Sequence, residues 1–149
     1  MSKFSTWVTG ARVRTLPLAI APVYLGSAVA FTLDRFDPVL ALLALVVSLF
    51  LQIGVNYAND YSDGIRGTDD DRVGPQRITA AGLARPDAVK RAAFITFGIA
   101  MAAGLVIVVI TSQWWLLGIG ALAVLAAWFY TGGKSPYGYA GLGEVAVFV

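Results

Sequence analysis

The organising feature of this chain is residues 56–69, which read Asn56-Tyr-Ala-Asn59-Asp60-Tyr-Ser-Asp63-Gly-Ile-Arg-Gly67-Thr-Asp69. They follow directly on a long apolar run. In a helix, positions 56, 59, 60 and 63 are spaced i, i+3, i+4 and i+7, so their side chains lie on one face. An apolar helix is therefore predicted to end in a stripe of amides and carboxylates, after which glycines let the chain leave the helix.

The composition places the rest of the chain in a membrane. Of its 149 residues, 58% are hydrophobic and only 13% are charged, whereas a soluble domain has roughly 25% charged residues. Cysteine and histidine are both absent, which excludes disulfides, thiolate chemistry, histidine-ligated metals and Ser-His-Asp triads. Any chemistry must use Asp, Glu, Asn, Lys, Arg, Tyr or a bound ion.

Uncharged runs near the ~20 residues that a helix needs to cross a bilayer predict an all-α fold, a polytopic transmembrane helical bundle. The turn Thr111-Ser112-Gln113 divides the longest run into two. A fifth run begins near Val145. The four predicted spans are Leu16–Leu33, Pro38 to about Ala58, Ala92–Ile110 and Trp114–Thr131.

The basic residues alternate with these spans and predict the orientation. They fall before the first span, after the second and after the fourth, while the opposite side receives only Arg35. By the positive-inside rule, the N-terminus and the Asp-rich loop are cytoplasmic, in a multi-pass protein of the cytoplasmic membrane. Residues 1–15 are predicted to form an amphipathic segment at the membrane surface.

The stripe is a candidate site because polar side chains at membrane depth are expensive and face a cavity or partner. Oxygen ligands suit a hard cation such as Mg²⁺, which often bridges carboxylates to substrate phosphates. Arginine grips phosphate oxygens with two donors, so Arg72, Arg77 and Lys134 are the candidate diphosphate ligands. Arg66 and Arg85 are interpreted as topology charges only.

The segment Asn59-Asp60-Tyr-Ser-Asp63 resembles the first aspartate-rich motif of the UbiA-type intramembrane prenyltransferases. Residues 56–69 as a whole resemble the branch that prenylates 1,4-dihydroxy-2-naphthoate in menaquinone synthesis. Further matching pieces are Arg14-Thr-Leu-Pro17, Gly74-Pro75-Gln76-Arg77 and Tyr137-Gly-Tyr-Ala-Gly-Leu-Gly143-Glu144.

The resemblance implies a bundle of about nine helices around a membrane-buried cavity, with Mg²⁺ held by two aspartate-rich motifs. Asn59, Asp60 and Asp63 would be the catalytic Mg²⁺–diphosphate ligands, with Asn56 and Asp69 as further metal ligands. Asp69 departs from the family pattern, which has its last acid at the place of Gly67. Arg14 would hold the carboxylate of the aromatic substrate.

The implied reaction is Mg²⁺-dependent transfer of a polyprenyl group from polyprenyl diphosphate to 1,4-dihydroxy-2-naphthoate, with loss of the ring carboxylate. Residues 1–149 would be a single transmembrane prenyltransferase domain. The second aspartate-rich motif belongs to the other half of the family fold, so we expect this chain to be the N-terminal half of a longer enzyme. Its partners would be the two substrates and the lipid bilayer, with no nucleic acid.

Three other interpretations fit the same residues. The acceptor could be 4-hydroxybenzoate or another aromatic compound. A transporter could use Asp60 and Asp63 to bind a transported cation. The chain could also be a non-catalytic fragment that is stable only with a missing half.

Overall fold

Helices form the framework of the chain, and no strand occurs in residues 2–68 and 76–143, which the computed structural model describes. The all-α prediction is therefore confirmed. The helices are α1 (Lys3–Ala11), α2 (Leu16–Thr32), α3 (Pro38–Arg66), α4 (Pro86–Thr111) and α5 (Leu116–Phe129), with 3₁₀ turns η1 (Val13–Thr15) and η2 (Tyr137–Ala140).

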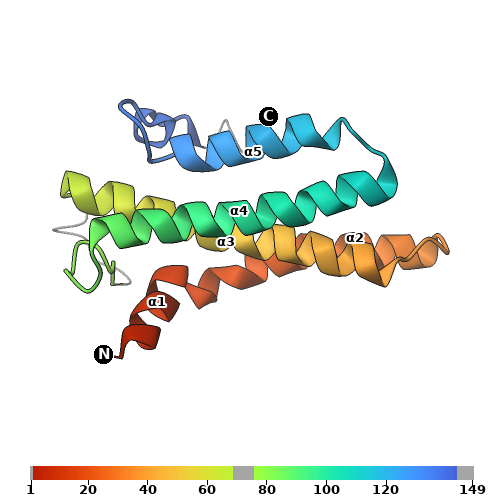
Figure 1. Cartoon of the computed structure of the whole chain (residues 1–149), viewed down its shortest axis with the longest axis horizontal. Helices are drawn as coiled ribbons and strands as arrows, with labels where there is room; N and C mark the ends of the chain where they lie inside the picture. The colour runs from red at the N-terminus through yellow and green to blue at the C-terminus, as the bar shows by residue number, and fades with distance from the viewer. Residues whose placement is uncertain (1, 69–75, 144–149) are drawn as a thin grey trace.

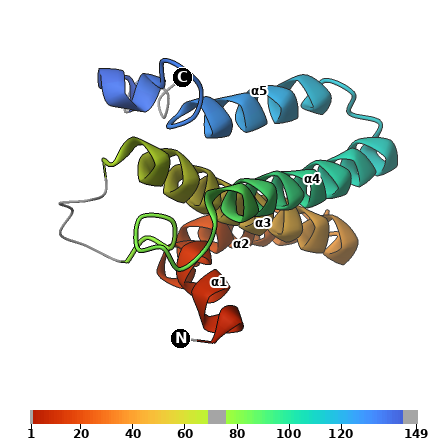
Figure 2. The same cartoon turned by 60° about the vertical axis from the view of Figure 1, so that its left-hand side comes forward.

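The long helices run antiparallel, and this arrangement gathers the polar segments at one end of the bundle (Figure 1). That end holds the N-terminus, the C-terminal end of α3, the segment before α4 and the C-terminal end of α5. The opposite end holds the short α2–α3 and α4–α5 connections, and the turned view in Figure 2 shows the same separation. The end rich in basic residues and the end that carries the stripe are therefore the same.

Helix α3 carries the stripe, and its boundaries follow from local chemistry. The Asp37 carboxylate accepts hydrogen bonds from Val39 N and Leu40 N at 2.8 and 3.1 Å and caps the start of the helix. The helix ends at Gly67, whose φ of 70° is the left-handed conformation that glycine adopts without strain. The predicted stripe is thus helical throughout. The chain leaves the helix at Gly67, the second of the two glycines in residues 56–69.

Three of the described helices are long and apolar enough to cross a membrane: the run Lys3–Thr32, α3 and α4. Helix α5, predicted over Trp114–Thr131, has only 14 residues, or roughly 21 Å at 1.5 Å per residue. It is shorter because residues 113–115 form a turn, in which Trp115 Nε1 donates to Gln113 Oε1 at 2.8 Å. The predicted fifth run, residues 145–149, lies outside the described residues.

The buried core lies beside the polar end of the bundle, so it fixes the residues of the stripe in place. Tyr57 and Ala58 of α3 pack with α4 and with Ile78, which comes from the segment before α4. Helix α1 crosses this cluster at Gly10, where an added Cβ would lie 2.7 Å from Ile78 Cδ1. The α4 members of the core are Val89, Ala93 and Phe97.

Close approach of α3 and α4 depends on Gly54, and replacing it with alanine is expected to destabilise the fold. An added Cβ would lie 2.5 Å from the Phe97 ring, which is only 1% exposed and has no room to swing away. We expect a loss of about 1–3 kcal/mol, the usual cost of overpacking, measured as a lower Tm in detergent.

Gly98→Ala is the matched control, because nothing lies within 4 Å of a Cβ added at that helical position. Both variants gain the same helix propensity, so the difference between their Tm values reports the clash. Equal Tm values would contradict the close packing at Gly54.

Candidate functional site

The candidate site is the C-terminal end of α3, where the stripe meets three other segments of the chain. Asn56, Asp60 and Asp63 are buried and Asn59 is half-buried. Carboxylates are disfavoured at this end of a helix because the macrodipole is negative there. Their charge must be offset by donors and cations from elsewhere, and the contacts below supply them.

Asp60 faces the segment before α4. Its side chain is 0% exposed, and its two oxygens accept hydrogen bonds from consecutive backbone amides. Thr79 N donates to Oδ1 at 2.8 Å, and Ile78 N donates to Oδ2 at 3.0 Å. The carboxylate therefore joins α3 to a turn 18 residues further along the chain.

Asp63 lies between a cation and a phenol. Arg77 Nη2 is 3.5 Å from Asp63 Oδ2, and the two side chains are 8% and 10% exposed. The Tyr139 hydroxyl donates a hydrogen bond to Asp63 Oδ1. Partial burial raises the pKa of Tyr139 above its usual range, and the hydrogen bond to Asp63 raises it further. The Tyr139 hydroxyl therefore stays protonated and donates a hydrogen bond to this carboxylate at neutral pH.

The segment after α5 is fastened to the same end of α3. Thr131 Oγ1 donates to Asn59 Oδ1 at 2.7 Å. The Arg66 guanidinium donates to the carbonyl oxygens of Thr131 and Gly133 and lies 5.5 Å from the centre of the Tyr139 ring. These contacts hold Tyr139 where it reaches Asp63.

Arg66 does more than the topology role predicted for it. Its spacing could have predicted a role at the site, because Arg66 follows Asp63 by three residues and so lies near the stripe. Tyr139 and Thr131 were also missed as site residues, since no local spacing connects them to α3.

Arg66→Ala is expected to loosen the turn after α5. Charge-assisted hydrogen bonds contribute more than neutral ones, so we expect trypsin to cleave after the exposed Lys134 on the order of tenfold faster. Arg66→Lys is the control, because it keeps the charge but cannot bind both carbonyls with a planar fork. It should behave like alanine; cleavage at the wild-type rate in both variants would show that Arg66 does not hold the turn.

Asn56 contacts the corner between α1 and α2. Its Nδ2 donates to Ala11 O and to Thr15 Oγ1, both at 2.9 Å, and its backbone oxygen accepts from Arg12 Nη2 at 3.5 Å. The Asn56 amide nitrogen is thus used to hold the corner in place. Its predicted role as a metal ligand would rest on Oδ1, which takes no part in these hydrogen bonds.

The structure brings some of the predicted site residues together and leaves others apart. Asn59, Asp60, Asp63 and Arg77 meet at the end of α3. Lys134 is exposed on the turn that Arg66 holds, and Arg14 is exposed on η1, next to Thr15. Asp69 and Arg72 lie outside the described residues.

The donors at this end fit Mg²⁺ bound together with a phosphorylated ligand rather than a cage made by protein alone. Within residues 2–68 and 76–143, no three acidic side chains cluster as a metal site. Asp63 has about four lone-pair positions, of which Arg77 and Tyr139 use two. One or two carboxylates with substrate phosphates are the usual Mg²⁺ environment, and Asp63 beside Asn59 meets that requirement.

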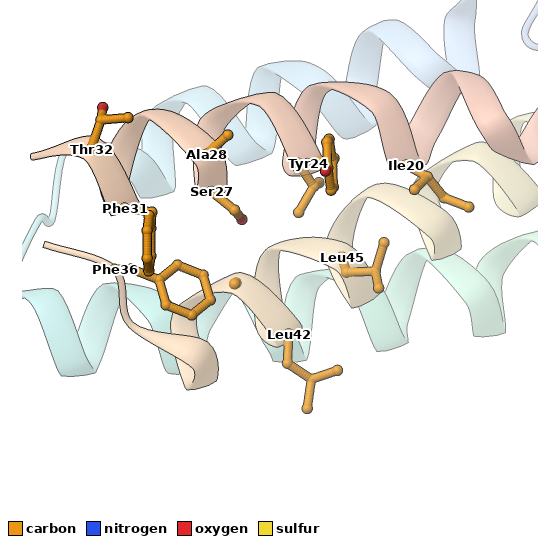
Figure 3. Close-up of a pocket in the computed structure, with 11 residues that line it drawn as sticks. Ile20, Tyr24, Ser27, Ala28, Phe31, Thr32, Phe36, Leu42 and Leu45 are labelled. Atoms are coloured by element: carbon orange, nitrogen blue, oxygen red, sulfur yellow. The ribbon is translucent and has the colours of Figure 1, made fainter. Parts of the chain in front are cut away.

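An open apolar groove of about 620 Å³ lies between α2 and α3, towards the opposite end of the bundle. Figure 3 shows its lining, with Tyr24, Ser27 and Phe31 on α2 above Leu42 and Leu45 on α3. No charged residue lines it. Its chemistry suits hydrocarbon, so the polar end remains the candidate reactive site.

Comparison with known proteins identifies relatives of the chain. The model of the UbiA prenyltransferase family matches residues 19–149. The chain is 55% identical over all its 149 residues to the 1,4-dihydroxy-2-naphthoate octaprenyltransferase of Mycobacterium tuberculosis, covering 51% of that protein. It is 40% identical to the Escherichia coli enzyme of the same name, covering 50%. The chain thus spans about half the length of these relatives, and no solved structure matches it.

Proposed function

Because the chain belongs to the UbiA prenyltransferase family, we propose that its protein transfers a polyprenyl group from polyprenyl diphosphate to 1,4-dihydroxy-2-naphthoate in menaquinone synthesis. The three apolar helices of spanning length among the described residues agree with a multi-pass membrane enzyme. The observation that carries the proposal is the buried Asp63–Arg77 pair at the end of an apolar helix. An ion pair in this position is costly to bury, which favours a role in binding over one in stability.

The acidic stripe would hold the metal and the arginines the diphosphate. The proposed Mg²⁺ ligands are Asn59 and Asp63, and Asp60, Asn56 and Asp69 are the further candidate ligands of the same motif. Mg²⁺ would neutralise the diphosphate and make it a better leaving group. Arg77, Arg72 and Lys134 would add fixed positive charge where negative charge develops as the allylic C–O bond breaks.

The remaining residues would bind and shield the organic groups. The apolar helices would exclude water, which would otherwise capture a prenyl cation. Arg14 would bind the carboxylate of the naphthoate ring from η1. Residues 1–149 would act as one domain, with the second aspartate-rich motif supplied by the other half of the family fold.

We also propose that the polar end faces the cytoplasm in the cell membrane. Both ends of the Asp-rich loop and the N-terminus lie at this end of the bundle, together with nearly all the basic residues, as the positive-inside rule requires. A cytoplasmic site would be open to the charged diphosphate and to a soluble aromatic acid.

The test is an assay on membranes that carry the protein, with labelled polyprenyl diphosphate and 1,4-dihydroxy-2-naphthoate. Product should form with Mg²⁺ and disappear with EDTA. Product from 4-hydroxybenzoate alone would change the acceptor but keep the reaction class. Cation flux into vesicles without a prenyl donor, and no product from any acceptor, would overturn the proposal in favour of a transporter.

A further inference from the structure

Asp60 is placed differently from Asp63, although both belong to the same acidic motif. Asp63 retains 10% side-chain exposure, and among the described residues its carboxylate contacts the side chains of Arg77 and Tyr139. Asp60 is fully buried, and each of its oxygens faces a backbone N–H. The difference indicates that the two carboxylates have different roles.

The two amides belong to a turn, and Asp60 is the acceptor that the described residues provide for them. Further along this turn Ala81 N donates to Arg77 O and Gly82 N donates to Thr79 O, both at 3.0 Å. These are the bonds of a single helical turn, whose first N–H groups have no internal partner. A carboxylate that accepts from such N–H groups is a strong cap, and Asp60 provides it from a separate helix.

Packing presses the turn against α3 on both sides of this cap. Ile78 is 0% exposed and lies against Gly10 and Tyr57. Thr79 lies against Gly64, where an added Cβ would be 2.6 Å from Thr79 Cβ. Arg77 immediately precedes these two residues, so the position of the turn decides where the guanidinium lies.

We propose that Asp60 is a positioning residue, which anchors the turn Arg77–Thr79 and so holds Arg77 beside Asp63 for the diphosphate. The effect on diphosphate binding rests on the proposed function, whereas the anchoring does not. Asp60→Ala would lower activity whether Asp60 binds metal or the turn, so alanine does not separate the two roles.

Hydrogen exchange at the amides of Ile78 and Thr79 distinguishes a metal ligand from an anchor of the turn. In the membrane-embedded protein, Asp60→Asn should speed exchange in residues 77–82 about 10- to 100-fold, because a charge-assisted acceptor is lost. The increase should be the same in EDTA and in Mg²⁺. Asp63→Asn is the matched control and should leave exchange in this turn within about threefold of the wild type. Unchanged exchange in Asp60→Asn, or protection that appears only with Mg²⁺, would overturn the proposal.

A second variant tests the anchor without altering any carboxylate. Thr79→Pro removes the N–H that donates to Asp60 Oδ1. Asp60→Asn and Thr79→Pro should each weaken binding of inorganic pyrophosphate about tenfold at saturating Mg²⁺. Each should also raise the KM for the prenyl diphosphate more than it lowers kcat. Tight binding in Thr79→Pro would contradict the proposal. If the wild type itself binds no pyrophosphate, the proposed function fails, while the exchange result still decides the anchor.

Discussion

Asp63→Ala is expected to lower prenyl transfer on the order of 10³-fold, the scale for removing a group that stabilises charge in the transition state. Asp63 is the carboxylate with both a cation and a phenol on its oxygens. In the proposed site it is also the main metal ligand. The variant loses the ligand and also removes a negative charge from beside the buried Arg77, which is costly. The measurement is single-turnover transfer from labelled polyprenyl diphosphate, with the Tm recorded for each preparation.

Asp63→Asn is the more conservative change at this position. Asparagine keeps the shape and an oxygen that can accept from Tyr139, but it removes the negative charge that binds a cation. We expect it to keep more of the wild-type Tm than Asp63→Ala does, because the hydrogen bond with Tyr139 remains, and to need a much higher Mg²⁺ concentration for half-maximal activity. Wild-type activity in Asp63→Asn at ordinary Mg²⁺ would exclude Asp63 as the metal ligand.

Arg77→Ala is expected to raise the KM for the prenyl diphosphate about 10- to 100-fold, because charge-assisted hydrogen bonds to phosphate oxygens are lost. Arg77 is 8% exposed and fixed beside Asp63, so little entropy opposes its contact with a ligand. The KM for the aromatic acceptor should change little. The measurement is initial-rate kinetics with each substrate varied in turn.

Arg85→Ala is the control for a general loss of basic charge at this end of the bundle. Arg85 pairs with Asp87 at 3.6 Å, but the two side chains are 84% and 73% exposed, so the pair contributes little. Arg85→Ala should therefore leave the KM values for both substrates unchanged. Equal effects of Arg77→Ala and Arg85→Ala would show that Arg77 acts only through the overall field.

The helices were predictable because their causes are local. Three-residue and four-residue spacing put the stripe on one face of α3, and an Asp-Pro start and a glycine end set its limits. Apolar run lengths predicted α2 and α4 well. They overestimated α5, because hydropathy does not distinguish a helix from the Trp114–Trp115 turn that precedes it.

The site was predictable only in part, and the division has a physical reason. The sequence by itself determined that carboxylates, amides and arginines gather at one end of an apolar bundle, since helical periodicity and charge alternation act over short distances along the chain. Only the tertiary structure decided which donor each acid receives: Ile78 and Thr79 for Asp60, Arg77 and Tyr139 for Asp63. These partners are 14 to 76 residues apart in sequence. They meet because α3 packs against α1 and α4 through small residues such as Gly10 and Gly54, and because Arg66 and Asn59 hold the segment after α5. No local pattern encodes that geometry.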